Sequence, residues 1–157
     1  MLTDIVIDTN VLLHAHNQQE VRHRASRELL IEMQNCATQL CVDEGFDLVE
    51  SRNRSQIASE YLRHLRHGML GLAVVAHLAA SRRVKQVPRK APPAFSRAVR
   101  RQIANGPDRV FVFVAFNSND KTLACHDFDD VPDTVRGRLR PLGVNIVDAE
   151  NALAALR

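Results

Sequence analysis

Two acidic residues follow short apolar runs that have the composition of buried strands. Asp8 comes directly after residues 5–7, and Asp127 comes soon after residues 122–125. In open parallel sheets, ligands bind beyond the carboxyl ends of the strands, which lie along one edge of the sheet. We therefore expect Asp8 and Asp127 to lie close together at that edge.

Further acidic residues can join this pair. Asp129 and Asp130 follow closely, Asp108 stands where a helix is expected to begin, and Glu60 lies within another expected helix. Carboxylates brought together repel one another, which raises their pKa values and destabilises the fold unless a cation neutralises them. Carboxylate oxygens select hard cations such as Mg²⁺ or Mn²⁺. Such a cluster suits metal-assisted hydrolysis of a phosphodiester bond.

Each acidic residue also has a simpler structural interpretation. Asp8 could cap the helix that follows it, because Asp is a preferred N-cap residue. Asp108 in a first helical turn would interact favourably with the helix dipole. The aspartates between 127 and 130 could cap the helix after Pro132, and Glu60 could form an exposed ion pair with Arg63. These alternatives stay open at the level of sequence.

The net charge of +3 conceals a strong asymmetry along the chain. Residues 51–107 contain twelve Lys or Arg and one acidic residue, Glu60, whereas seventeen acidic residues lie elsewhere. A long basic stretch of this kind favours a polyanionic partner, although a solvated surface is the simpler alternative. Phe95 is the only aromatic residue in the most basic part, so binding would depend mainly on phosphate charge. The residues expected to contact nucleic acid are Arg63, Arg82, Arg83, Lys85, Arg89, Lys90, Arg97, Arg100 and Arg101.

Composition excludes several other classes of protein. No apolar run approaches the roughly 20 residues that cross a bilayer, and the first residues do not have the pattern of a signal peptide. The three cysteines are odd in number and form no CxxC pair, which argues against a disulfide framework or a cysteine-rich zinc site. We expect a cytoplasmic protein without a membrane association.

Apolar segments of strand and helix character alternate along the chain, which predicts a single α/β domain with a mostly parallel sheet. Residues 110–116 are ambiguous, because their composition favours a strand while residues 105–108 look like a helix start. A basic insertion or arm, exposed and partly mobile, is expected at about 81–106. Strands are expected near 4–8, 39–42, 122–125 and 143–147, and helices near 21–33, 57–65, 68–80, 94–104, 132–139 and 149–156.

Five segments together resemble the PIN-domain family of metal-dependent ribonucleases. Residues 5–13, IVIDTNVLL, are similar to the family's opening strand and first acid. Residues 59–62, 108–112 and 123–129 are similar to the segments that carry the second, third and fourth acids, and residues 143–149 to the last strand and helix. The resemblance covers most of the chain except the basic segment. It also favours a helix over residues 110–116.

The resemblance implies a three-layer α/β/α sandwich and an endoribonuclease that depends on Mg²⁺ or Mn²⁺. By position, it implies catalytic and metal-binding roles for Asp8, Glu60, Asp108 and Asp127. It further implies that many relatives are toxins with an antitoxin protein as partner, and that homodimers are common. The implied accessory residues are Asp129 as a further ligand and Thr9 and Asn10 as supporting groups.

One position departs from the family pattern. Cys125 stands where the family usually has Thr or Ser, two residues before the fourth acid, so a hydroxyl that could support metal-bound water or phosphate is missing. A non-catalytic RNA-binding or assembly module with a degenerate site is therefore an alternative. A phosphatase of the haloacid dehalogenase type is a weaker one, because Asn10 occupies the position where that family needs a second Asp.

Overall fold

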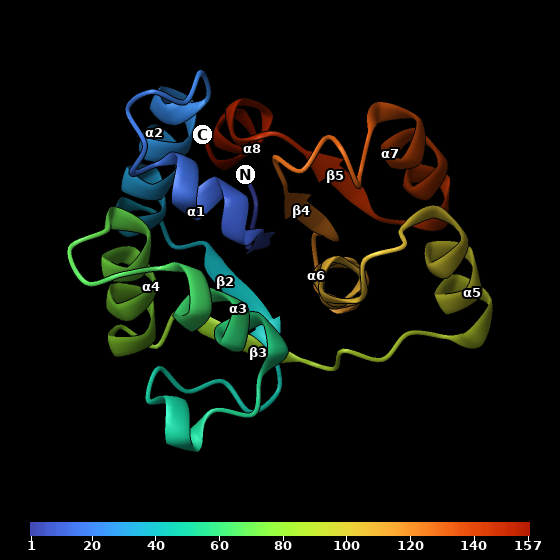
Figure 1. Ribbon diagram of the computed structural model, residues 1–157, viewed down its shortest axis with the longest axis horizontal. Coiled ribbons are helices and arrows are strands. Elements are labelled where there is room, and N and C mark those ends of the chain that lie inside the picture. The colour runs from blue at the N-terminus through green and yellow to red at the C-terminus, as the bar shows by residue number, and fades with distance from the viewer.

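A five-stranded, all-parallel sheet forms the centre of the computed structural model, which describes residues 1–157 (Figure 1). The strand order is β3-β2-β1-β4-β5, and each pair of neighbours runs parallel. Helices cover both faces, so the expected three-layer α/β/α sandwich is confirmed. The strands are β1 (Asp4–Ile7), β2 (Gln39–Asp43), β3 (Val84–Val87), β4 (Thr122–Ala124) and β5 (Asn145–Val147).

The helices fall into two layers. On one face α6 packs against β1, β2 and β4 and contacts both α3 and α5; on the other α2 packs between α4 and α8 (Figure 1). No helix is both long enough and apolar enough to cross a bilayer. The helices are α1 (Thr9–His14), α2 (His23–Asn35), α3 (Gln56–His64), α4 (Leu70–Ala80), α5 (Pro93–Gln102), α6 (Gly106–Asn117), α7 (Asp133–Leu139) and α8 (Ala149–Leu156), with 3₁₀ turns η1 (Glu50–Arg52) and η2 (Arg140–Leu142).

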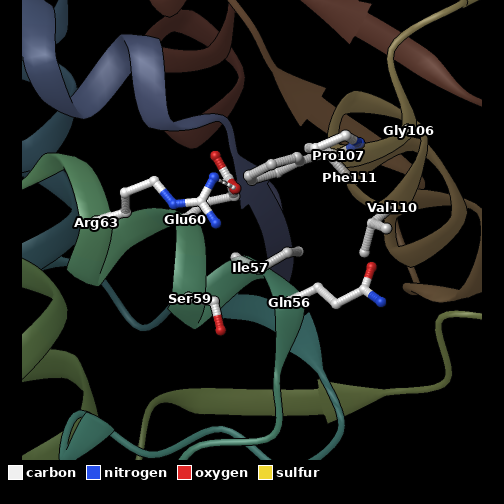
Figure 2. A pocket seen from close by; sticks show the side chains of 9 residues that line it. All are labelled: Gln56, Ile57, Ser59, Glu60, Arg63, Gly106, Pro107, Val110 and Phe111. Carbon is white, nitrogen blue, oxygen red and sulfur yellow. Dashed lines mark ion pairs between the residues drawn. The ribbon is translucent and has the colours of Figure 1, made fainter.

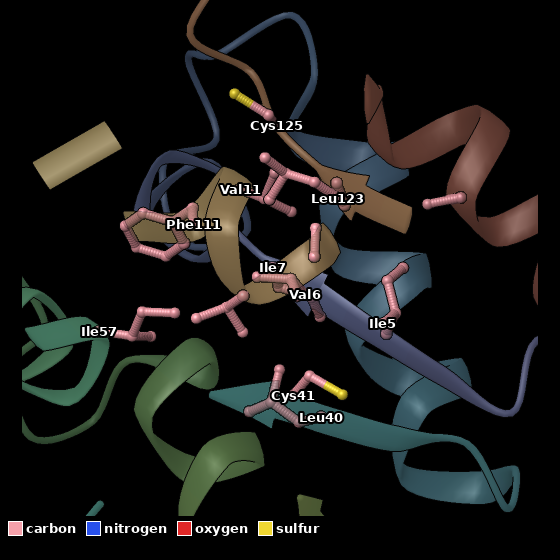
Figure 3. Packing of buried hydrophobic residues seen from close by; sticks show 14 of the residues in the cluster. Ile5, Val6, Ile7, Val11, Leu40, Cys41, Ile57, Phe111, Leu123 and Cys125 are labelled. Carbon is pink, nitrogen blue, oxygen red and sulfur yellow. The ribbon is translucent and has the colours of Figure 1, made fainter. Parts of the chain in front are cut away.

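Strand β1 lies in the middle of the core. All four of its residues are buried, as expected for a strand covered on both faces. Figure 3 shows Ile7 of β1 near Leu123 of β4 and Phe111 of α6. This packing fixes the carboxyl end of β1, where Asp8 follows, and a fixed strand end holds a functional side chain more rigidly than a loop does.

The ambiguous run 110–116 is helical, as the resemblance favoured. It lies in α6, which begins at Gly106 with Pro107 and Asp108 in its first turn. Pro is well suited to the first turn of a helix, and strand propensity is a weak preference that packing overrides. Five residues of α6 are buried, because the helix is covered by the sheet below and by helices beside it.

The segment 81–106 differs from the expected exposed arm. Residues 84–87 form the edge strand β3, which pairs with β2, and α5 packs against α6 through Phe95. The Phe95 ring stacks on Phe116 with centroids 4.2 Å apart and meets Phe113 edge-on at 6.3 Å. The strand was missed because it is short and carries a lysine, a common feature of sheet edges. Most residues between β3 and α5 are exposed, as expected, and the expected helix is present as α5.

Candidate metal centre

Four acidic side chains from distant parts of the sequence line one pocket of about 320 Å³. Asp8 follows β1, Glu60 lies on α3, Asp108 lies in the first turn of α6, and Asp127 follows β4. The expected convergence of these four residues is therefore present in the structure. Thr9 and Asn10, the expected supporting residues, line the same pocket.

The parallel pairing of β1 with β4 brings two of these acids together. Ile7 is in register with Ala124, and the Asp8 N–H donates to the Ala124 carbonyl at 2.8 Å, so both chains leave the sheet at the same edge. The buried Arg136 holds the turn after β4: its guanidinium donates to the carbonyls of Val131 at 2.8 Å and Cys125 at 3.1 Å. These contacts orient the segment that carries Asp127.

Asp8 is at the N-cap position of α1 but does not act as a capping side chain. Its carboxylate makes no cap hydrogen bond, and only 6% of the residue is exposed. Burial raises the Asp8 pKa to about 6 and the Asp127 carboxylate adds to the rise, while the hydrogen bond from the Cys125 thiol opposes it. The Asp8 carboxyl therefore ionises at a higher pH than an ordinary aspartate, and a bound cation would favour its anionic form.

The Cys125 thiol connects two of the acids. Its Sγ lies 3.5 Å from Oδ2 of Asp8, to which it donates, and it accepts from the Asp127 N–H at 3.4 Å. Burial and the nearby Asp8 carboxylate raise the thiol pKa well above its usual range, so the thiol stays neutral and keeps its proton. The position that lacks the usual hydroxyl therefore still provides a donor, though a weaker one.

Among the acidic residues of the pocket, Asp108 has the pKa that is raised furthest. Burial, and then repulsion from Asp8, Asp127, Asp130 and Glu60, raises its pKa to about 7. Its Oδ2 is buried and has no hydrogen-bond partner. A buried, unpartnered carboxylate oxygen is costly, and a favourable position in the first helical turn does not satisfy that atom.

Asp130, and not Asp129, completes the acidic group. One oxygen each from Asp108, Asp127 and Asp130 lie within 4.8 Å of one another, and Asp129 does not belong to this group. The turn after β4 accounts for the difference, because the Asp130 N–H donates to Oδ1 of Asp127 at 3.0 Å. The expected accessory role of Asp129 is corrected accordingly; three aspartates in one short turn gave no sequence signal to choose among them.

Glu60 both forms the ion pair with Arg63 that was expected of a surface residue and belongs to the acidic pocket. Its carboxylate pairs with Arg63 at 3.2 Å and with His64 at 3.4 Å, and it also faces the acidic pocket. His64 and Asn105 line the pocket although neither was among the expected site residues. The available signals were the spacing of His64 four residues after Glu60 and the position of Asn105 just before the Gly-Pro helix start.

Three of the basic residues that were expected to contact nucleic acid bind groups of the protein itself. Lys85 pairs with the buried Asp4 at 2.7 Å, and Arg89 pairs with the buried Asp43 at 3.1 Å. The Arg83 guanidinium donates to carbonyls at the end of α2 and just after it, including that of Gln34 at 3.0 Å. Their partners lie far away in sequence, which is why the basic run alone did not reveal these structural roles.

The other basic residues are exposed, but they do not share one surface. Arg82 precedes β3 and so lies at the amino end of the strands, opposite the acidic pocket. Beyond the carboxyl end of β3, a second pocket of about 400 Å³ is lined by Lys90, Arg97 and Arg100, with Phe113 at its wall. We call this the basic pocket. Arg63 is exposed at the acidic pocket itself, and Arg101 is exposed on α5.

Comparisons with known proteins do not add to this description. Neither the protein-family models nor the curated proteins searched give a match to the chain. The function must be inferred from the site, whose donor set is that of a hard divalent cation: several carboxylates, one of them with a buried unpartnered oxygen.

Proposed function

We propose that this protein is an endoribonuclease of the PIN type that depends on Mg²⁺ or Mn²⁺. The observation that carries the proposal is the convergence of Asp8, Glu60, Asp108 and Asp127 in one pocket, with the Asp108 oxygen unpartnered. Asp108, Asp127 and Asp130, whose oxygens lie within 4.8 Å of one another, would hold the ion together with Asp8, and Glu60 would stand at its edge.

The metal ion, when bound, supplies Lewis-acid stabilisation of charge on a phosphate and activation of a water molecule. The chain's own residues prepare that chemistry. The Cys125 thiol orients the Asp8 carboxylate, and the buried Arg136 fixes the turn that carries Asp127. Arg63 at the rim of the pocket would meet an incoming phosphate.

The charge distribution supports a nucleic-acid substrate. The exposed Lys90, Arg97 and Arg100 surround the basic pocket beyond the strand ends. Phosphate contacts of this kind give affinity that falls with salt and carries little sequence information. The resemblance to the PIN family supports RNA as the substrate, the cytoplasm as the compartment, and an antitoxin protein or a second copy of the chain as partner.

The test is cleavage of an RNA in Mn²⁺ or Mg²⁺ by the wild-type protein and by Asp8→Asn. We expect cleavage that is abolished by EDTA and reduced at least 100-fold in the variant, because a principal ligand loses its charge. Asp129→Asn is the matched control, since this exposed aspartate lies outside the pocket and its removal should leave the rate unchanged. Undiminished cleavage in EDTA would contradict the proposal.

A second candidate is a non-catalytic RNA-binding module, and the weak donor Cys125 is the observation that favours it. This alternative requires RNA binding that depends on the basic pocket without cleavage in any divalent metal. Replacing Arg97 and Arg100 would then abolish the only measurable activity, whereas Asp8→Asn would leave it intact or strengthen it.

A further inference from the structure

A second cavity adjoins the acidic pocket. It has a volume of about 380 Å³, lies between α3 and α6, and is called here the α3–α6 pocket. It shares Glu60, Arg63, Pro107 and Phe111 with the acidic pocket. A chain held by a phosphate at the acidic pocket can therefore place its next group in the adjoining α3–α6 pocket.

Three hydrophobic side chains form the apolar part of the wall of the α3–α6 pocket. Ile57 comes from α3, and Val110 and Phe111 come from α6; their side chains face one another across the opening in Figure 2. All three residues are buried in the core behind the pocket. Such walls suit a ligand with apolar faces, and the volume is within the roughly 300–1,000 Å³ typical of small-molecule sites.

One polar side chain at the opening of the α3–α6 pocket has no hydrogen-bond partner within the protein. The Gln56 side chain extends from α3 toward Val110 in Figure 2, and its carboxamide makes no hydrogen bond within the protein. The Gln56 backbone is fixed, because its N–H donates to the buried Asp43 at 2.7 Å. The nearby Ser59 hydroxyl is already used: it donates to the Ser55 carbonyl at 2.9 Å and accepts from Asn53 at 3.0 Å.

We propose that the α3–α6 pocket binds the base of the nucleotide next to the scissile phosphate, and that Gln56 reads the edge of that base. A nucleobase has the two required properties, apolar faces and a hydrogen-bonding edge. A carboxamide offers donors and an acceptor together, which is the complement of adenine. Adenine is therefore the expected base. This inference rests on the proposed nuclease function and extends it to substrate choice.

The arrangement of the pockets around α6 supports a strand passing through this site. With about 100° of turn per residue, Phe111, Val110 and Phe113 follow one another around the helix in the direction away from Asp108. Phe111 belongs to the acidic and α3–α6 pockets, Val110 to the α3–α6 pocket, and Phe113 to the basic pocket. An RNA strand can thus run from the metal centre past the base site to the exposed arginines of α5.

Binding is tested first without catalysis, by titrating the metal-free protein with adenosine or uridine and following methyl NMR signals. Adenosine at millimolar concentration should shift the signals of Ile57 and Val110, and uridine should shift them less. Gln56→Trp, which fills the mouth from an exposed position, should abolish these shifts. Gln18→Trp is the control, because Gln18 is exposed in a loop far from the pocket in sequence and outside its lining.

Specificity is tested by mapping cleavage sites on an RNA of random sequence. The wild-type protein should favour adenine at one position beside the cut, and Gln56→Ala should reduce that preference by roughly 5- to 100-fold, the range of one bidentate base contact. Gln18→Ala should leave the preference unchanged. Mn²⁺ affinity should be equal in all three proteins, because none of the acidic residues is altered.

The outcomes separate the two proposals. Adenosine-dependent shifts in a protein that cuts no RNA would contradict the nuclease function and leave the base site standing. Metal-dependent cleavage with unmoved methyl signals and an unchanged cleavage pattern in Gln56→Ala would overturn the base site and leave the nuclease function standing.

Discussion

At the scale of single residues, the site is defined by carboxylates that are unfavourable to ionise. The pKa of Asp8 is raised to about 6 and that of Asp108 to about 7, both chiefly by burial. The metal-free fold therefore binds protons that the unfolded chain has already released. Its stability should fall as pH rises from about 4, where unfolded Asp ionises, through 6 and 7, where the folded groups do. A bound cation would reverse this trend.

Neutralising Asp108 should accordingly stabilise the metal-free protein. We expect Asp108→Asn to raise the free energy of unfolding by about 1 kcal/mol above pH 7, a value reduced for the partial exposure of this group. Urea denaturation in EDTA measures it, and Asp129→Asn serves as the control for loss of one negative charge. A clear loss of stability in Asp108→Asn would show that Asp108 serves the fold and not a cation.

The Cys125 position should tune the pH dependence of metal binding. In Cys125→Ser the hydroxyl is a stronger hydrogen-bond donor to Asp8 than the thiol, so the pKa of Asp8 should fall. Because Mn²⁺ binds ionised carboxylates, its affinity for the variant should then persist to lower pH. Cys125→Ala should shift the same curve to higher pH by removing the donor. Calorimetric titration with Mn²⁺ across this pH range measures both shifts. Identical curves for the two variants would exclude a role for the thiol in supporting Asp8.

At the scale of elements, a third strand-end carboxylate has a purely structural role. Asp43 ends β2 and is fully buried; it accepts hydrogen bonds from Ser55 Oγ at 2.5 Å and from the N–H groups of Gln56 and Ile57, and it pairs with Arg89. It thereby fixes the start of α3 to the sheet and to the segment that leads into α5. Glu60 and Gln56 owe their positions to this junction.

Removing that junction should damage stability and the site together. Asp43→Ala removes the acceptor of the Ser55 hydroxyl and of the first N–H groups of α3, and should cost about 3 kcal/mol, because buried donors lose their partner. Asp47→Ala, whose carboxylate pairs with Arg52 near the surface, should cost clearly less. Denaturant unfolding compares the two. Equal effects would contradict the junction assigned to Asp43.

Arginines of α5 should make the main electrostatic contacts with the phosphates of RNA. Replacing Arg97 and Arg100 by Ala should weaken binding and lower the slope of log affinity against log salt by about 0.7 for each lost phosphate contact to a single strand. Arg82→Ala should change neither quantity, since Arg82 lies at the amino end of the strands. Fluorescence anisotropy at several salt concentrations measures the slopes. An equal effect of Arg82→Ala would mean that binding follows total charge and not the basic pocket.

At the scale of the whole molecule, the sheet order explains which features the sequence could predict. Asp8 and Asp127 were predictable because each follows an apolar strand, and parallel strands end at one edge. Glu60 and Asp108 lie on helices, where the residues alone left a structural interpretation open and the family resemblance added the functional one. The separation of Asp130 from Asp129 depends on one turn, and the structural roles of Lys85 and Arg89 depend on partners more than forty residues away. The α3–α6 pocket exists only where two helices meet, so no local pattern could reveal it.

The central claim is tested most directly by crystals grown with Mn²⁺ and measured for anomalous scattering. A strong anomalous peak is expected in the pocket between Asp8, Asp108 and Asp127, and it should be absent from crystals of Asp108→Asn. Crystals with no Mn²⁺ in this pocket, or with Mn²⁺ bound only at other carboxylates, would contradict it.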